Sequence, residues 1–476
     1  MKYRLADTRL VSAKGHEFLF LAAENAIFEV GSDTKALLDQ WSPKKELAKE
    51  EILPRLTGSP QEREEFFEAL LQRHVLLPSS LPESSRIVMP HPSQKPAPLK
   101  TLVLHVTGSC NLACTYCYQS SPGRSPKNTE SMSLDLARKA VDFLFAHAGN
   151  LEELVLVLFG GEPLLNFKLI APVVEYAQGK AAEHQKRIIF SITTNGTCLT
   201  PEIIRFIEQN QISVTVSIDG PEEVHDLHRR FPDGSPTYKK ILPNIKNLLR
   251  AQIGRPIAAR VTLVKNADLV PQIFDHLRDL GFSEVGFAPI TTEDFTYQIN
   301  NEGMDKLLEH FNILADRFLQ AAGRGEFFGF SNLIDMVVNL HQGEILSHPC
   351  GAGQGLFSVD SRGDLYLCQR FTGEKEFRMG DIFNGLSLDT IDTFSAKAEV
   401  SQKKACQDCV ARCTCAGGCY YEAWVRQGSI FKPNLQYCEW IRKWLGIGLN
   451  VYSSLSLSNP EYLERLSIFR GHTTTH

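Results

Sequence analysis

The chain has 476 residues, of which 43% are hydrophobic and 22% are charged, and its formal net charge is -5. This composition excludes a disordered chain and predicts two or three domains, while the acidic balance argues against a nucleic-acid partner. No apolar run reaches the roughly 20 residues of a membrane helix, and the N-terminus lacks the apolar stretch of a signal peptide. We therefore expect a cytoplasmic protein with neither a membrane nor a nucleic acid as partner.

Residues 1–85 form the first expected domain. Its short apolar strands and helical patterns fall at 17–21, 27–30, 34–41 and 62–77. Proline and serine accumulate after this domain, where regular structure is hard to maintain. We therefore interpret residues 86–100 as a linker.

Residues 101–310 change to apolar runs separated by amphipathic segments. Six runs have the pattern of buried parallel strands, at 101–106, 154–159, 188–193, 213–218, 258–264 and 285–290. Segments such as 134–148 and 269–281 predict helices between them. Repeated strand–helix units predict an α/β fold, a partial (β/α)6 barrel with helices outside. Ligands are then expected at the carboxyl ends of the strands.

The rest of the chain divides into two expected parts. Residues 311–345 are interpreted as bridging helices, and residues 346–476 as a cysteine-rich domain. The latter has Gly-rich loops and few long periodic segments. Bound metal would have to supply much of its order.

Twelve cysteines in a cytosolic chain predict metal or cluster ligation, because that compartment keeps thiols reduced. Only Cys198 stands alone, and we interpret it as a small core residue. The first group follows the first strand with C-x3-C-x2-C spacing, at Cys110, Cys114 and Cys117. Three thiolates can hold three irons of a [4Fe-4S] cluster and leave the fourth iron open. A zinc site is the alternative, although structural zinc takes four protein ligands.

The loop TGSCNLACTYCYQ, with an aromatic residue before its third cysteine, resembles the signature of the radical S-adenosylmethionine (SAM) superfamily. The resemblance continues in FGGEP after the second strand, where the family places a glycine-rich turn against the amino group of SAM. It implies SAM-binding positions at Tyr116, Gly160, Gly161, Glu162, Asn195, Ser217 and Arg229. The planar guanidinium of Arg229 suits the SAM carboxylate. A solvated surface position for Arg229 and a simple turn at Asn195 are the alternatives.

The resemblance also implies a mechanism. SAM would chelate the open iron, and reductive cleavage would give a 5'-deoxyadenosyl radical that removes a hydrogen atom from the substrate. A flavodoxin- or ferredoxin-type protein would supply the electron. Asp219, His225 and His228 are candidate bases by placement, and a solvated helix face is the alternative for the two histidines.

The C-terminal cysteines resemble the SPASM domain, which adds two auxiliary clusters to radical SAM enzymes. The resemblance implies an outer cluster on Cys406, Cys409, Cys415 and Cys438, and an inner cluster on Cys350, Cys368 and Cys419. The inner set is one ligand short, so either Cys413 completes it or an iron stays open to a substrate thiolate. Two zinc ribbons are the alternative. The expected cofactors are SAM and three [4Fe-4S] clusters.

The first 80 residues resemble the winged-helix peptide-recognition domains of peptide-modifying systems, which bind a leader segment as an added strand. A simple cap over the barrel is the alternative.

The whole chain is most similar to the maturase family of quinohemoprotein amine dehydrogenase, which joins Cys sulfur to methylene carbons of Asp or Glu. The implied partner is a small Cys-containing polypeptide with a leader segment, and the implied activity is thioether crosslinking. One alternative is an anaerobic sulfatase-maturase-type oxidation of Cys or Ser to formylglycine. That group usually carries an acid after the second SPASM cysteine, whereas Gln369 follows Cys368 here. A non-catalytic iron-sulfur electron carrier is the other alternative.

Overall fold

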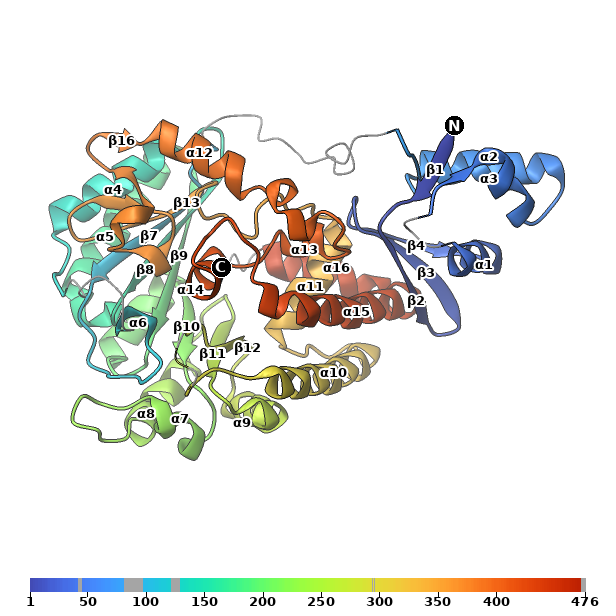
Figure 1. The fold of residues 1–476 in the computed structure, drawn as a ribbon. Helices are drawn as coiled ribbons and strands as arrows, with labels where there is room; N and C mark the ends of the chain where they lie inside the picture. Colours follow the sequence, from blue (N-terminus) through green and yellow to red (C-terminus); the bar gives the residue numbers. More distant parts are fainter. Residues whose placement is uncertain (42–44, 81–96, 121–128, 293, 295, 472–476) are drawn as a thin grey trace.

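Ten strands form the largest sheet of the computed structural model, which describes residues 1–41, 45–80, 97–120, 129–292, 294 and 296–471 (Figure 1). Six of its strands are parallel and adjacent in chain order: β7 (Thr101–Thr107), β8 (Glu153–Gly160), β9 (Arg187–Thr194), β10 (Ser213–Ser217), β11 (Ile257–Leu263) and β12 (Glu284–Pro289). Strand β12 is at the edge of the sheet, so these strands do not close into a full barrel. The α/β fold and all six predicted strands are confirmed.

Helices cover the outer side of these strands (Figure 1). They are α4 (Leu134–Ala146), α5 (Phe167–Glu183), α6 (Pro201–Gln209), α7 (Glu222–His228), α8 (Tyr238–Leu248) and α9 (Val270–Leu280). In α4, the Ser133 hydroxyl caps the first turn, and apolar residues at helical spacing are buried against the sheet. Each helical connection returns the chain to the amino end of the next strand. All six strands therefore point the same way, and their carboxyl ends lie together.

The cysteine-rich region extends the same sheet, which the sequence did not predict. Strand β13 (Leu356–Val359) pairs in parallel with β7. Strands β14 (Asp364–Tyr366), β15 (Arg378–Asp381) and β16 (Gly385–Leu386) continue the sheet in antiparallel order. The loops of this region are therefore attached to the barrel through backbone hydrogen bonds.

Helices fill much of the C-terminal half. They are α10 (Asn301–Gly323), α11 (Ser331–Gln342), α12 (Leu388–Ala398), α13 (Arg412–Cys415), α14 (Tyr420–Gln427), α15 (Leu435–Ser458) and α16 (Pro460–Gly471). The expectation of few long periodic segments is wrong for α15, which has 24 residues. Small residues in this helix obscured its apolar pattern. Gly448 is required by packing, because a Cβ there would lie 2.4 Å from Met336 Cγ.

The N-terminal module contains two small sheets. One has the strand order β5-β1-β6 and the other β2-β3-β4. The elements are β1 (Lys2–Leu5), β2 (Thr8–Ala13), β3 (His16–Leu21), β4 (Ala26–Val30), α1 (Ser32–Gln40), β5 (Leu47–Ala48), α2 (Lys49–Ile52), α3 (Pro60–Gln72) and β6 (Leu76–Pro78). Both predicted strands and both predicted helices occur. The helix predicted at 62–77 ends earlier, at Gln72, and its last two residues belong to β6. Most of the expected linker lies outside the described residues.

The N-terminal module lies beside α15 (Figure 1), and its β2–β3 hairpin contacts the C-terminal half. Phe20 packs in a buried apolar cluster with Leu340, Leu445 and Leu449. We call this contact the docking face. No helix of the described residues is long and apolar enough to cross a membrane.

Candidate active site

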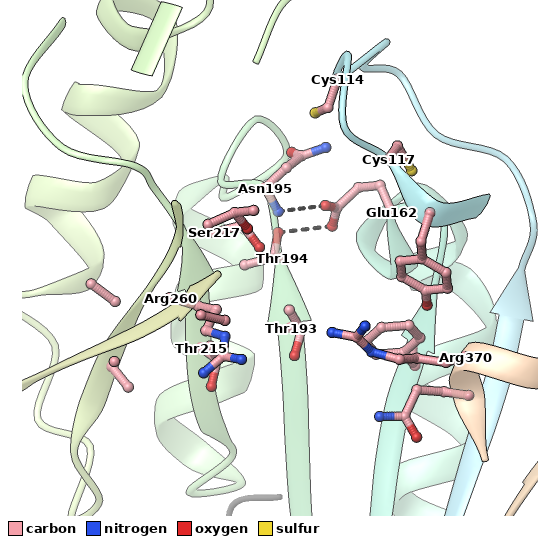
Figure 2. Close-up of a pocket in the computed structure, with 18 of the residues that line it drawn as sticks. Cys114, Cys117, Glu162, Thr193, Thr194, Asn195, Thr215, Ser217, Arg260 and Arg370 are labelled. Carbon is pink, nitrogen blue, oxygen red and sulfur yellow. Dashed lines mark hydrogen bonds between the residues drawn. The ribbon is translucent and has the colours of Figure 1, made fainter. Parts of the chain in front are cut away.

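A cavity of about 540 Å³ lies inside the six parallel strands. Cys110, Cys114 and Cys117 line it, as do side chains from β8 to β12. Figure 2 shows Cys114 and Cys117 beyond the end of the strands, with Arg260 and Arg370 deeper in the cavity. The expected ligand position at the carboxyl ends of the strands therefore coincides with a cavity.

Backbone hydrogen bonds fix the three-cysteine loop to the segment after α7. Ala113 N donates to Arg230 O at 2.8 Å, and Thr115 N donates to His228 O at 3.0 Å. Burial raises the pKa of the Cys114 thiol to about 11, while the nearby Arg229 guanidinium lowers it. A bound cation would favour the thiolate form that coordinates metal.

The glycine pair after β8 is required by the close approach of two backbones. A Cβ at Gly160 would lie 2.1 Å from Thr107 O, and one at Gly161 would lie 2.2 Å from Ser109 O. In return, Gly161 N donates to Thr107 O at 2.9 Å. This turn holds the start of the cysteine loop against the end of β8.

Glu162 is buried at the end of this turn and connects it to β9. Its carboxylate accepts hydrogen bonds from Thr194 Oγ1 at 2.8 Å and from Asn195 N at 2.6 Å (Figure 2). A third, from Leu164 N, is 3.2 Å long. Burial raises the pKa of Glu162 to about 7, against the lowering effect of these donors. The carboxylate thus fixes the cavity wall.

Asn195 and Ser217 both line the cavity. The Asn195 side chain accepts a hydrogen bond from Thr197 N at 3.0 Å, which is a turn contact. Its Nδ2 donates to Asn111 Oδ1 at 3.0 Å and lies 3.8 Å from Cys110 Sγ. Asn195 therefore forms the turn and also reaches the cysteine loop. Ser217, at the end of β10, lies near it in Figure 2.

Arg229 is buried, so the alternative of a solvated surface position is wrong. Its Nη1 donates to Tyr116 OH at 2.8 Å, and Tyr116 OH donates to Asp219 Oδ2 at 2.5 Å. Burial raises the pKa of Asp219, while Arg229 lowers it. The buried Arg229 Nε has no hydrogen-bond partner among the described residues. The Arg229 guanidinium, which lines the cavity, therefore retains this one unpaired N–H donor, which suits an anionic ligand.

The two histidines of α7 do not form a solvated face. His225 is fully buried, and burial with the nearby Arg229 lowers its pKa to about 2. The alternative of a solvated helix face is therefore wrong for His225, because α7 turns this side chain inward and leaves Leu227 60% exposed. His228 is partly exposed, and its Nδ1 lies 2.8 Å from Thr115 Oγ1. The candidate bases Asp219, His225 and His228 are not among the residues that line the cavity.

The thiols of the C-terminal region form two groups. Burial raises the pKa of Cys368 to about 12, and Cys419 and Cys350 add to the rise. Likewise, burial raises the pKa of Cys415 to about 12, with contributions from Cys406, Cys409 and Cys438. The other thiols of each group are thus close enough to raise the pKa of Cys368 in one group and of Cys415 in the other.

Cys413 belongs to neither group by its contacts. Its buried Sγ donates a 3.8 Å hydrogen bond to Ala23 O of the N-terminal module. Burial raises its pKa to about 11, and the charged neighbours that affect it are Arg412 and Asp7. Cys198 packs against the main core.

The donor sets fit iron-sulfur clusters and SAM. Thiolates are the preferred ligands of such clusters, and each of the three cysteine groups supplies at least three. Among the described residues, no three His, Cys, Asp or Glu side chains converge closely enough to hold a single metal ion. Arg229, which lines the cavity and has an unpaired Nε among the described residues, would suit an anion such as the SAM carboxylate.

Arg260 and Arg370 line the cavity but were missed from the sequence. Arg260 interrupts the apolar pattern of β11, which is the signal that could have identified it. Arg370 had no such signal, because it lies in a single 3₁₀ turn, Gln369–Phe371, two residues after Cys368.

Comparisons with known proteins agree with this geometry. The model of the Radical SAM superfamily matches residues 104–267. Uncharacterized protein MJ0907 of Methanocaldococcus jannaschii is 30% identical over 279 residues, 58% of this chain and 86% of that protein. The serine-type anaerobic sulfatase-maturating enzyme of Bacteroides thetaiotaomicron is 27% identical over 377 residues, 71% of this chain and 86% of the enzyme.

A solved structure shows the same fold. Native anSMEcpe with bound AdoMet aligns with a TM-score of 0.64 at 21% identity, covering 76% of this chain and 100% of the other. The family match, the similar protein from M. jannaschii and the three-cysteine loop at the cavity together show that the chain belongs to the radical SAM superfamily.

Proposed function

We propose that this chain is a peptide-modifying enzyme that forms thioether bonds between Cys sulfur and methylene carbons of Asp or Glu in a small polypeptide. The observation that carries the proposal is a three-cysteine loop that opens onto a cavity of about 540 Å³. The similarity to a sulfatase-maturating enzyme supports a polypeptide as substrate. When bound, a [4Fe-4S] cluster and SAM supply the hydrogen-atom abstraction that activates an unreactive carbon.

The chain's own residues would orient SAM. Arg229 would bind its carboxylate through the open Nε, while Tyr116 and Asp219 keep the guanidinium in place. The turn at Gly160 and Gly161 would receive its amino group. Ser217 and Asn195 would contact the ribose.

The two C-terminal cysteine groups would hold the auxiliary clusters. Cys368 of the inner group is followed directly by Gln369 and Arg370, which line the cavity. Cys413 bonds to the N-terminal module instead, which supports an inner iron open to a substrate thiolate. Each crosslink would remove two hydrogens: one atom passes to the adenosyl group and the thiol loses its proton. The remaining electron would return through the clusters.

The N-terminal module would bind the leader segment of the substrate. Strand β4 is an edge of the sheet β2-β3-β4. An edge strand can accept a peptide as an additional strand through backbone hydrogen bonds.

Formylglycine formation is the second candidate, and the named sulfatase-maturating relative favours it. The two reactions give different products. A thioether retains the sulfur and loses two hydrogens, whereas conversion of Cys to formylglycine removes the sulfur.

The test is to co-express the chain anaerobically with any small Cys-rich polypeptide encoded beside it and to measure the intact mass of that polypeptide. We expect a loss of two hydrogens per crosslink, one 5'-deoxyadenosine for each, and about twelve irons per reconstituted chain. Sulfur loss would favour formylglycine formation. Absence of 5'-deoxyadenosine, together with an unchanged polypeptide, would favour an electron carrier. The control replaces Cys110, Cys114 and Cys117 by Ala, which should abolish SAM cleavage and remove about four irons.

A further inference from the structure

The cavity contains more positive charge than its own acidic residues neutralise. Arg470 forms ion pairs with Glu284 and with Asp335, both at 2.7 Å, which accounts for two of the carboxylates that line it. Glu162, the third, accepts three hydrogen bonds from neutral groups of the wall. The charge of Arg260, which lies on the cavity wall beside Thr215 (Figure 2), has no such explanation.

Arg260 lies in the central part of β11, level with Ser217 of β10 and Gly286 of β12. Gly286 leaves room for the arginine, because a Cβ there would lie 3.7 Å from Arg260 Nη1. The side chain is accessible to water inside the cavity. Among the described residues, no hydrogen bond or ion pair occupies its guanidinium. A charged side chain in a buried strand normally has such a partner.

A second arginine borders the same space. Arg370 donates from Nη1 to Thr291 Oγ1 at 3.3 Å, and its guanidinium lies over the rings of Tyr118 and Tyr421 at 5.5 and 5.2 Å. These contacts fix its orientation. Partial desolvation inside the cavity, and then the charge of Arg370, lower the pKa of Arg260 to about 10. An anion between the two guanidinium groups would relieve this repulsion.

The acidic residues nearest to Arg260 are already engaged. Asp335 pairs with Arg470, while Glu422 accepts hydrogen bonds of 3.2 Å from Thr291 and from Asn434. A purely structural ion pair for Arg260 is therefore absent from the described part of the chain. The neighbouring Gln369 also lines the cavity, and its buried Oε1 has no hydrogen-bond partner among the described residues.

We propose that Arg260, assisted by Arg370, binds the side-chain carboxylate of an Asp or Glu of the polypeptide substrate. This inference rests on the proposed function, since it assumes that a polypeptide enters the cavity. Figure 2 shows Arg260 below the cysteine loop. A carboxylate bound at Arg260 therefore leaves the attached methylene carbons between the arginine and the SAM end of the cavity. The arginine would select acidic residues and orient the carbon that reacts.

The test compares two capped peptides that differ in one residue: acetyl-Cys-Ala-Ala-Glu-Ala-amide and the same peptide with Gln in place of Glu. Both are titrated calorimetrically into SAM-saturated, cluster-loaded protein. We expect the wild-type protein to prefer the Glu peptide by about tenfold or more, as for a charge-assisted hydrogen bond. Arg260→Gln should bind both peptides equally, and Arg260→Lys should retain part of the preference. Arg205→Gln, on the exposed side of α6, is the matched control and should behave as wild type.

Three outcomes would overturn the inference: a wild-type protein without preference, a preference that survives in Arg260→Gln, or a tenfold weaker affinity of this variant for SAM with the peptide preference intact. The last result would assign Arg260 to the SAM carboxylate. If Arg260→Gln fails to fold, glutarate and glutaramide are compared as competitors of the Glu peptide in the wild-type protein, and equal competition counts against the inference. These results are independent of the product, because acid selectivity can be measured even if no thioether forms.

Discussion

The ionisation of Glu162 is linked to the geometry of the site. Its carboxyl group ties the turn after β8 to Thr194 and Asn195. Burial raises its pKa from 4.5 to about 7 in the folded chain. Between these two values the folded state therefore binds more protons than the unfolded state, and the stability contributed by the protonated group is lost as the pH rises through about 7.

Glu162→Gln removes this titration, so the stability difference between wild type and variant should depend on pH. Relative to the variant, wild type should lose up to about 3 kcal/mol of unfolding free energy between pH 4.5 and 7, and little more at higher pH. Anaerobic unfolding in urea from pH 5 to pH 8 measures the free energy of unfolding of both proteins. The thiols that the two proteins share titrate alike, so their contribution cancels in the difference. Glu202→Gln, on the exposed side of α6, is the control for the loss of one carboxylate. A constant difference between wild type and Glu162→Gln would contradict the linkage.

Helix α13 is a short element that carries cysteines with two different orientations. Cys415 is grouped with the outer thiols, whereas Cys413 points to Ala23. We expect Cys413→Ala to retain all of its iron and the spectrum of the inner cluster, because the change removes only one small buried side chain, at a cost of about 1 kcal/mol. Cys368→Ala should lose the inner cluster.

Iron analysis and paramagnetic resonance spectra of the reconstituted variants measure this difference. We expect added substrate thiol to change the spectrum of the proposed inner cluster in Cys413→Ala and in wild type alike. Loss of about four irons from Cys413→Ala would instead make Cys413 the fourth ligand, and the open-iron mechanism would then fail.

The elements that the sequence predicted are those with a strong local pattern. The six barrel strands are visible in the sequence as short runs rich in buried apolar residues, although β10 alternates buried valines with polar residues that line the cavity. The cysteine loop was equally visible from its spacing. Its position at the cavity followed from the rule that ligands bind at the carboxyl ends of parallel strands.

Other features depended on contacts between distant parts of the chain. Strand β13 has four residues, and its partner β7 lies about 250 residues earlier, so no local pattern could predict the pairing. The inward turn of His225 depends on contacts with Asp219 and Thr237. The orientation of Cys413 depends on how the N-terminal module packs against the C-terminal half. Local sequence contains none of this information.

At the scale of the whole molecule, the docking face joins the N-terminal module to the loop of the outer cysteine group. Arg412 lies between Cys409 and Cys415 in sequence, and its side chain is 1% exposed. Its Nη1 donates to Asp7 Oδ2 at 2.5 Å, across the two parts of the chain. The proposed peptide-binding module is thereby connected to the proposed outer cluster.

Asp7→Ala should therefore destabilise the chain by about 3 kcal/mol, because it leaves a buried arginine without its counter-charge. The double variant Asp7→Ala, Arg412→Met should recover part of this loss, since no buried charge remains.

Glu326→Ala is the matched control: it breaks an ion pair with Arg324 in which both side chains are more than half exposed, and it should cost less than about 1 kcal/mol. Thermal unfolding measures the three effects, and hydrogen exchange in β2 and β3 reports whether the module detaches. We also expect Asp7→Ala to lose iron from the outer group first, because Arg412 is flanked by two of the proposed ligands, Cys409 and Cys415. Equal effects of Asp7→Ala and Glu326→Ala, with unchanged exchange in β2 and β3, would mean that the ion pair does not hold the module in place.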